Sequence, residues 1–109
     1  MPYANEKRIP LAVSTSTAGD NVLIAAPGEG KYLAIDFIAL NPDGGAQTIT
    51  MKTGNTNIAY ALNDNQPLTF ENAIHDYEGI LTCKNNTAFT LNLGAATSIT
   101  GYIKYRICG

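Results

Sequence analysis

The stretch from Asn86 to Ile107 constrains the fold most, because apolar side chains recur in it at every second position. In its first segment these residues are Phe89, Leu91 and Leu93, and in its second they are Ile99, Ile103, Tyr105 and Ile107, with Gly101 in the same phase. The small residues 94–96 separate the two segments. Side chains alternate between the two faces of a β-strand, so this stretch predicts an antiparallel pair with one buried face.

The rest of the chain repeats this pattern in short segments that end at turn signals rich in glycine, proline and asparagine. We therefore predict an all-β, single-domain antiparallel β-sandwich with jelly-roll-like or Greek-key connections and about 8–9 short strands. Residues 1–8 are expected to form an N-terminal arm and residues 9–109 the sandwich domain. The one place for a helical turn is Glu71–Glu78, which is too short to be stable alone.

The predicted core consists of the apolar residues on the inward phase of these strands. They are Ile9, Leu11, Val13, Leu33, Ile35, Phe37, Ile49, Phe70, Leu81, Phe89, Leu91, Ile103 and Tyr105. Pro10 cannot donate a backbone hydrogen bond, so the first strand is expected at a sheet edge.

The segment Lys31–Leu40 is the longest apolar strand, and neither of its faces is strongly polar. Its second face would carry Tyr32, Ala34, Asp36 and Ile38. Such a strand is expected to lie centrally or to contact another subunit. This pattern and the low charge favour a homo-oligomer, with a trimer preferred, because closed symmetry buries such a surface.

Charged residues make up only 15% of the chain, and the formal net charge is −2. Nucleic-acid binders carry basic patches, so no nucleic-acid partner is expected. No apolar run is long enough for a membrane-spanning helix, and the first residues lack the apolar core of a signal peptide. We therefore expect that the protein is synthesised in a cytosol and does not associate with a membrane.

No constellation of catalytic residues is evident. His75 is the one histidine, and its neighbours Asp76 and Glu78 are too close in sequence to converge with it on a substrate. We predict no catalytic site, no metal site and no cofactor, and therefore a protein that is not an enzyme. Cys83 and Cys108 would form a disulfide only if their strands lie close together.

Three segments resemble small β-sandwich virion proteins of tailed bacteriophages, especially head decoration (cement) proteins. They are the polar arm before Ile9, the strand 31–40 with the following Asn-Pro-Asp-Gly-Gly, and the closing segment 98–107. The resemblance implies a non-enzymatic subunit, often trimeric, that binds the major capsid protein on the outer surface of the head. It also implies location in the virion after synthesis in the host bacterial cytoplasm. The alternative is a carbohydrate- or receptor-binding module of a phage tail or fibre.

The candidate residues for contact with another subunit or with the capsid lie on the arm and on the second face of the long strand. One further candidate is a tyrosine that could reach the surface of the closing strand. Tyrosine is enriched at interfaces because it has a large apolar body and a polar tip. The candidates are Tyr3, Lys7, Arg8, Tyr32, Asp36, Ile38 and Tyr102.

Overall fold

The computed structural model describes residues 7–54, 56–71 and 80–109, and within them the chain forms nine β-strands. The strands are β1 (Ile9–Thr15), β2 (Gly19–Ile24), β3 (Tyr32–Asp43), β4 (Gln47–Lys52), β5 (Asn57–Leu62), β6 (Leu68–Glu71), β7 (Leu81–Cys83), β8 (Phe89–Leu93) and β9 (Ser98–Cys108). The predicted all-β class and strand number are confirmed. The expected helical turn over 71–78 falls almost entirely on residues outside the described ranges.

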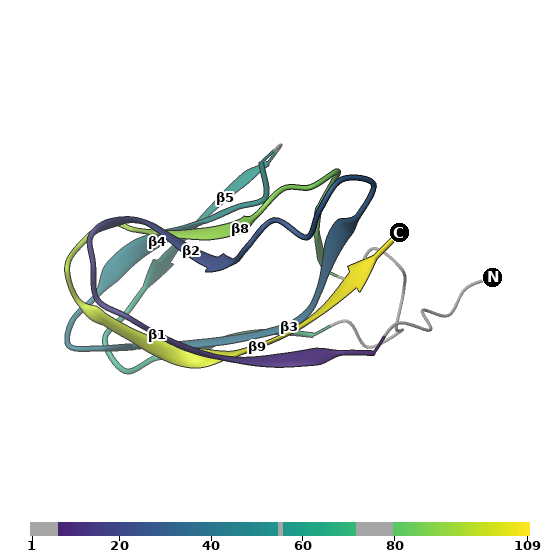
Figure 1. The fold of residues 1–109 in the computed structure, drawn as a ribbon. Helices are drawn as coiled ribbons and strands as arrows, with labels where there is room; N and C mark the ends of the chain where they lie inside the picture. The colour runs from purple at the N-terminus through teal and green to yellow at the C-terminus, as the bar shows by residue number, and fades with distance from the viewer. Residues whose placement is uncertain (1–6, 55, 72–79) are drawn as a thin grey trace.

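The strands form two antiparallel sheets that face each other as a sandwich (Figure 1). The five-stranded sheet has the order β1-β9-β3-β6, and β7 pairs with β3 on the same edge as β6. The four-stranded sheet has the order β2-β8-β4-β5. If β6 and β7 are counted as one interrupted strand, this is the connectivity of a jelly roll. As expected for a strand containing Pro10, β1 lies at a sheet edge, and β3 lies centrally.

The core lies between the sheets and is built from the alternating apolar residues of both. Phe89, Leu91 and Leu93 of β8 and Ile99 and Ile103 of β9 are at most 2% exposed. The other buried apolar residues of this cluster are Val13, Ile24, Leu33, Ile35, Ile38, Leu40, Ile49, Met51, Leu62 and Cys83. Burial of this apolar area is the main stabilising term of the fold.

Part of the predicted assignment of side chains to the two faces of β3 is wrong, because this strand contains a β-bulge. Ile35 is paired with Tyr105 and Phe37 with Lys104, so Asp36 is an extra residue in β3. One inserted residue exchanges the faces of everything that follows. Phe37 therefore leaves the predicted core for the outer face, and Ile38, expected on the outer face, is fully buried between the sheets.

One side of the sandwich is closed by a direct connection between the sheets. The short turn 16–18 joins β1 to β2, and below it Thr15 Oγ1 donates a hydrogen bond to Asn21 Oδ1 at 2.7 Å. The Asn21 amide group donates to the carbonyl oxygens of Thr17 and Gly19 at 2.9 and 3.1 Å. We call this the closed side, and it carries a polar plug between the two edge strands.

Candidate interaction surfaces

The outer face of the five-stranded sheet carries an apolar surface that is centred on two aromatic rings. Phe37 and Tyr102 have ring centroids 5.9 Å apart at an interplanar angle of 61°. Tyr102 lies opposite Ala12 on one side and Ala39 on the other, and Lys104 lies opposite Pro10. We call this surface the aromatic face and define it as Pro10, Ala12, Phe37, Ala39, Tyr102 and Lys104.

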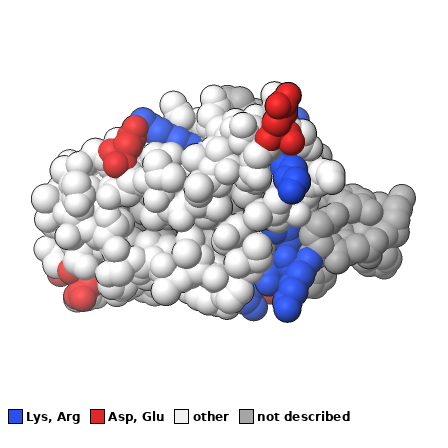
Figure 2. Space-filling model, viewed as in Figure 1, with Lys and Arg blue, Asp and Glu red and all other residues white. Residues whose placement is uncertain are grey.

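Positive charge borders the aromatic face at one end. Lys104 Nζ lies 5.8 Å from the centroid of the Tyr102 ring, a cation–π distance. Lys7 is exposed and Arg8 half-buried just before β1. Figure 2 shows a largely uncharged surface with blue side chains gathered near the beginning of β1. A surface rich in aromatic residues and poor in charged ones is the composition typical of the core of a protein interface.

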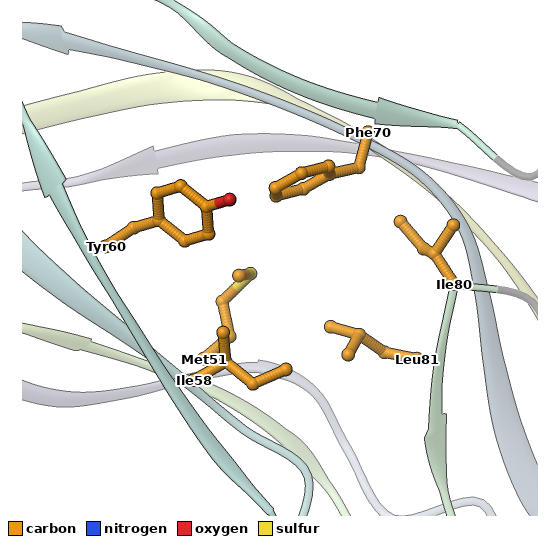
Figure 3. Close-up of a pocket in the computed structure, with 6 residues that line it drawn as sticks. All are labelled: Met51, Ile58, Tyr60, Phe70, Ile80 and Leu81. Carbon is orange, nitrogen blue, oxygen red and sulfur yellow. The ribbon is translucent and has the colours of Figure 1, made fainter.

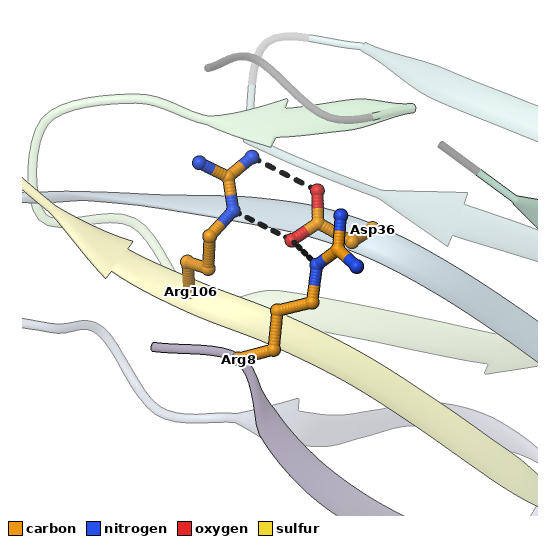
Figure 4. Close-up of polar contacts among 3 residues, drawn as sticks. All are labelled: Arg8, Asp36 and Arg106. Atoms are coloured by element: carbon orange, nitrogen blue, oxygen red, sulfur yellow. Dashed lines mark hydrogen bonds and ion pairs between the residues drawn. The ribbon is translucent and has the colours of Figure 1, made fainter. Parts of the chain in front are cut away.

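Asp36, the bulge residue, anchors a buried ion-pair network beside the aromatic face (Figure 4). Arg106 Nε and Nη2 donate to Asp36 Oδ2 and Oδ1 at 2.6 and 2.9 Å, which is bidentate geometry. Arg8 Nε donates to Asp36 Oδ2 at 3.2 Å. The Arg106 and Asp36 side chains are only 1% and 2% exposed. This network ties the beginning of β1 and the end of β9 to the bulge in β3.

The structure separates the residues that the sequence grouped as contact candidates. Tyr102 is 36% exposed on the aromatic face, while Tyr32 is half-buried. Arg8 and Asp36 do come together, but as a structural ion pair in which Asp36 is buried. Ile38 is a core residue and has no exposed surface to offer a partner. Lys7 is exposed near β1, and Tyr3 lies outside the described residues.

The apolarity of both faces of 31–40, on which the expected trimer rests, has an explanation within the domain. Leu33, Ile35, Ile38 and Leu40 contribute to the core on either side of the bulge. Ala34 is also fully buried, and Asp36 is covered in its ion pair. This strand therefore does not by itself indicate a subunit contact, and the trimer stays a prediction.

A second surface lies on the side opposite the closed side, between the edge strands β5 and β6–β7. A cavity of about 250 Å³ opens there, lined by Met51, Ile58, Tyr60, Phe70, Ile80 and Leu81. The six side chains converge on it in Figure 3. Tyr60 and Phe70 span the gap between the sheets, with ring centroids 5.4 Å apart and an interplanar angle of 65°. We call this the open side.

The open side was not identified from the sequence. Phe70 and Leu81 were assigned to the core, and they do pack against it, but they also line the cavity. The sequence of 57–62 contains neither a charged residue nor a proline, so nothing in it marks this strand as a sheet edge. A strand with that composition is unusual at a sheet edge.

The two cysteines lie on opposite sides of β3. Cys83 is opposite Leu33 and faces the core, whereas Cys108 is opposite Tyr32, one position further along the alternation. Their side chains therefore point to opposite faces of the sheet, and they are not bonded to each other. Burial raises the pKa of the Cys83 thiol to about 11, which keeps it protonated and unreactive near neutral pH.

We next consider metal-binding groups and shifted pKa values among the other described residues. Within 7–54, 56–71 and 80–109, no group of three or more histidine, cysteine or acidic side chains is placed to hold a metal ion. His75, Asp76 and Glu78 lie outside these ranges. On the four-stranded sheet, hydrogen bonds from Asn92 and from Lys52 keep the pKa of Asp20 below its usual value. In the described part of the chain, no helix has the length and apolarity needed to cross a membrane.

No protein-family model matches the chain, and no curated protein matches it. It is similar to a solved structure from work on Bacillus endospore appendages, described as a novel family of disulfide-linked pili. The TM-score is 0.46 and the identity 18%, over 98% of this chain and 91% of the other. It is also similar to a chain of the virus-like particle of extra small virus from the giant freshwater prawn Macrobrachium rosenbergii. There the TM-score is 0.39 and the identity 10%, over 96% of this chain and 81% of the other. At these scores neither similarity bears on function.

Proposed function

We propose that this protein is a non-enzymatic structural subunit of a tailed-phage virion, namely a decoration protein that binds the outer surface of the head and stabilises it. The observation that carries the proposal is the aromatic face. It consists of Phe37, Tyr102 and small side chains around Lys104, and Lys7 and Arg8 lie just before β1. Aromatic residues on a rigid sheet are suitable anchors for a protein partner, because they bury a large area at a low cost in side-chain entropy.

The charged residues in and around the aromatic face suggest the charge of the partner surface that would contact it. Lys7 and Arg8, just before β1, are basic, as is Lys104 within the face, whereas Glu71 lies on the opposite border, beside Phe37. A capsid surface with acidic groups near an apolar patch would complement the basic border. The major capsid protein is therefore the proposed partner, and the virion the proposed location.

The alternative, a carbohydrate- or receptor-binding module of a tail or fibre, is less well supported by the aromatic face. Phe37 and Tyr102 are inclined at 61°, so they do not present one flat platform to a sugar ring. The Lys104 ammonium also lies over the Tyr102 ring. Binding of the isolated protein to a glycan array would favour this alternative.

The test is occupancy on purified heads of the phage whose genome encodes this chain. Tyr102→Ala removes the exposed ring of the aromatic face, and we expect it to lower occupancy at least about tenfold. Val22→Ala is the control, because Val22 is an exposed apolar residue on β2, away from both the aromatic face and the open side. Deleting residues 1–7 tests the arm and retains Arg8, which anchors the beginning of β1. Heads that bind neither the wild type nor any variant would contradict the proposal, as would equal binding of wild type and Tyr102→Ala.

A further inference from the structure

The edge strands of the sandwich differ in how they are protected against pairing with another chain. Natural edge strands avoid such pairing by proline, charge, bulges or shortness. In the five-stranded sheet, β1 contains Pro10, while β6 and β7 have only four and three residues. In the four-stranded sheet, β2 carries Asp20 and a break in register between Val22 and Ile24. Each of these edges therefore has at least one protective feature.

The remaining edge strand, β5, has none of these features. It pairs with β4 over six consecutive positions without a break in register, so it is regular throughout. Its residues, Asn57–Leu62, include no charged side chain and no proline. Ala59, Tyr60 and Ala61 are exposed. Alternate residues of an antiparallel edge strand direct their backbone N–H and C=O groups away from the sheet, where they can pair with another strand.

We propose that two copies of this chain associate through β5, which pairs antiparallel with β5 of the second copy around a two-fold axis. The two four-stranded sheets then become one continuous sheet. Two features favour a second copy as the partner. The strand is uncharged, so identical copies meet there without repulsion despite the net charge of −2. A two-fold contact also consumes both exposed edges, so association stops at a closed dimer, which is an alternative to the trimer predicted from the sequence.

The open side gives this pairing an apolar contact beside the backbone hydrogen bonds. Ile58 and Tyr60 of β5 line the cavity, and the Tyr60 side chain is 40% exposed. Pairing two β5 strands brings the open sides of both copies next to each other, so that Tyr60 and the cavity mouth lose contact with water. Burial of this apolar area stabilises the dimer. The contact uses a surface other than the aromatic face, so it neither requires nor excludes binding to a capsid.

The test uses charge at Ala59 and Ala61, whose exposed side chains leave room for longer residues in the single chain. Ala59→Lys/Ala61→Lys places like charges across the two-fold axis, and we expect it to raise the dimer dissociation constant about tenfold or more. Ala59→Glu/Ala61→Glu should have the same effect. A mixture of the two variants should recover the dimer, because opposite charges then face each other. Val22→Lys, on the other edge of the same sheet, is the matched control and should leave the dimer intact.

The measurement is sedimentation velocity in free solution, with circular dichroism to confirm that each variant is folded. We expect wild type and Val22→Lys at twice the monomer mass, each doubly charged variant at the monomer mass, and the mixture at twice the monomer mass. A wild type that is monomeric at micromolar concentration or trimeric would overturn the proposal. So would doubly charged variants that remain dimeric, or a mixture of folded variants that stays monomeric, since only β5 against β5 predicts the rescue.

Discussion

The two long sides of this sandwich differ in how they close the space between the sheets. On the closed side, Asn21 and Thr15 form a polar plug between β1 and β2, directly below the turn that joins the sheets. On the open side, the described side chains that line the cavity between β5 and β6–β7 are mainly apolar, and the rings of Tyr60 and Phe70 span the gap between the sheets. On the closed side Thr15 and Asn21 find hydrogen-bond partners within the chain, whereas the open side leaves apolar surface and a strand edge in contact with water. The closed side contributes to the stability of the single domain, and the open side is where we propose that two copies associate.

The largest predicted difference in unfolding free energy is between two Phe→Ala substitutions, one in the core and one at the open side. Phe89 is 1% exposed, and Phe89→Ala should lower the free energy of unfolding by about 4 kcal/mol. Phe70 borders the cavity and is half-buried, so Phe70→Ala should cost about 2 kcal/mol or less. Urea denaturation of both variants measures the difference. Equal losses would show that the open side is packed as tightly as the rest of the core.

Two asparagines on the edge strands of the four-stranded sheet give the next comparison. Asn21→Ala removes the hydrogen bonds to Thr15, Thr17 and Gly19 and should cost about 2–3 kcal/mol. Asn57→Ala, an exposed position on β5, should change the free energy of unfolding by less than about 0.5 kcal/mol. Thermal and urea unfolding report both values. A small loss for Asn21→Ala would mean that the closed side is not held by its polar plug.

The smallest effect concerns the pH dependence of stability through Cys83, on the strand that borders the open side. Its pKa is about 11 in the folded chain instead of 9.0. Because the folded-state pKa is raised, the contribution of Cys83 is complete below pH 9 and is lost as pH rises toward about 11. Between about pH 8 and about pH 10 the loss should be about 1 kcal/mol. Comparing Cys83→Ala with the wild type over this range isolates the contribution of Cys83 from that of the rest of the protein, and identical pH profiles would contradict it.

The alternation of apolar residues was enough to predict the class of this fold. Phe89, Leu91 and Ile103 follow a period of two without interruption, and hydrophobic burial on one face leaves few other solutions. The bulge at Asp36 could not be predicted in this way, because nothing within 31–40 marks the inserted residue. Its partner Arg106 is 70 positions away, so the ion pair that covers Asp36 depends on the assembled sheet.

The interaction surfaces could be predicted only in part, for a related reason. Tyr102 was identified because a tyrosine on the polar phase of a strand tends to be exposed. Phe37 was assigned to the core, since the bulge that turns it outward is invisible in the sequence. The open side depends on which strands lie at the sheet edges, and this is a property of topology that local patterns do not contain.

Hydrogen exchange of the backbone amides, measured over a range of protein concentrations, tests most directly the claim that the open side is where copies meet. The account predicts that amides of β5 directed away from β4 exchange more slowly as concentration rises, while those of β1 and β2 do not change. Ala59→Lys/Ala61→Lys should abolish the concentration dependence. Exchange in β5 that is independent of concentration, with protection gained in β1 or β2 instead, would contradict the account.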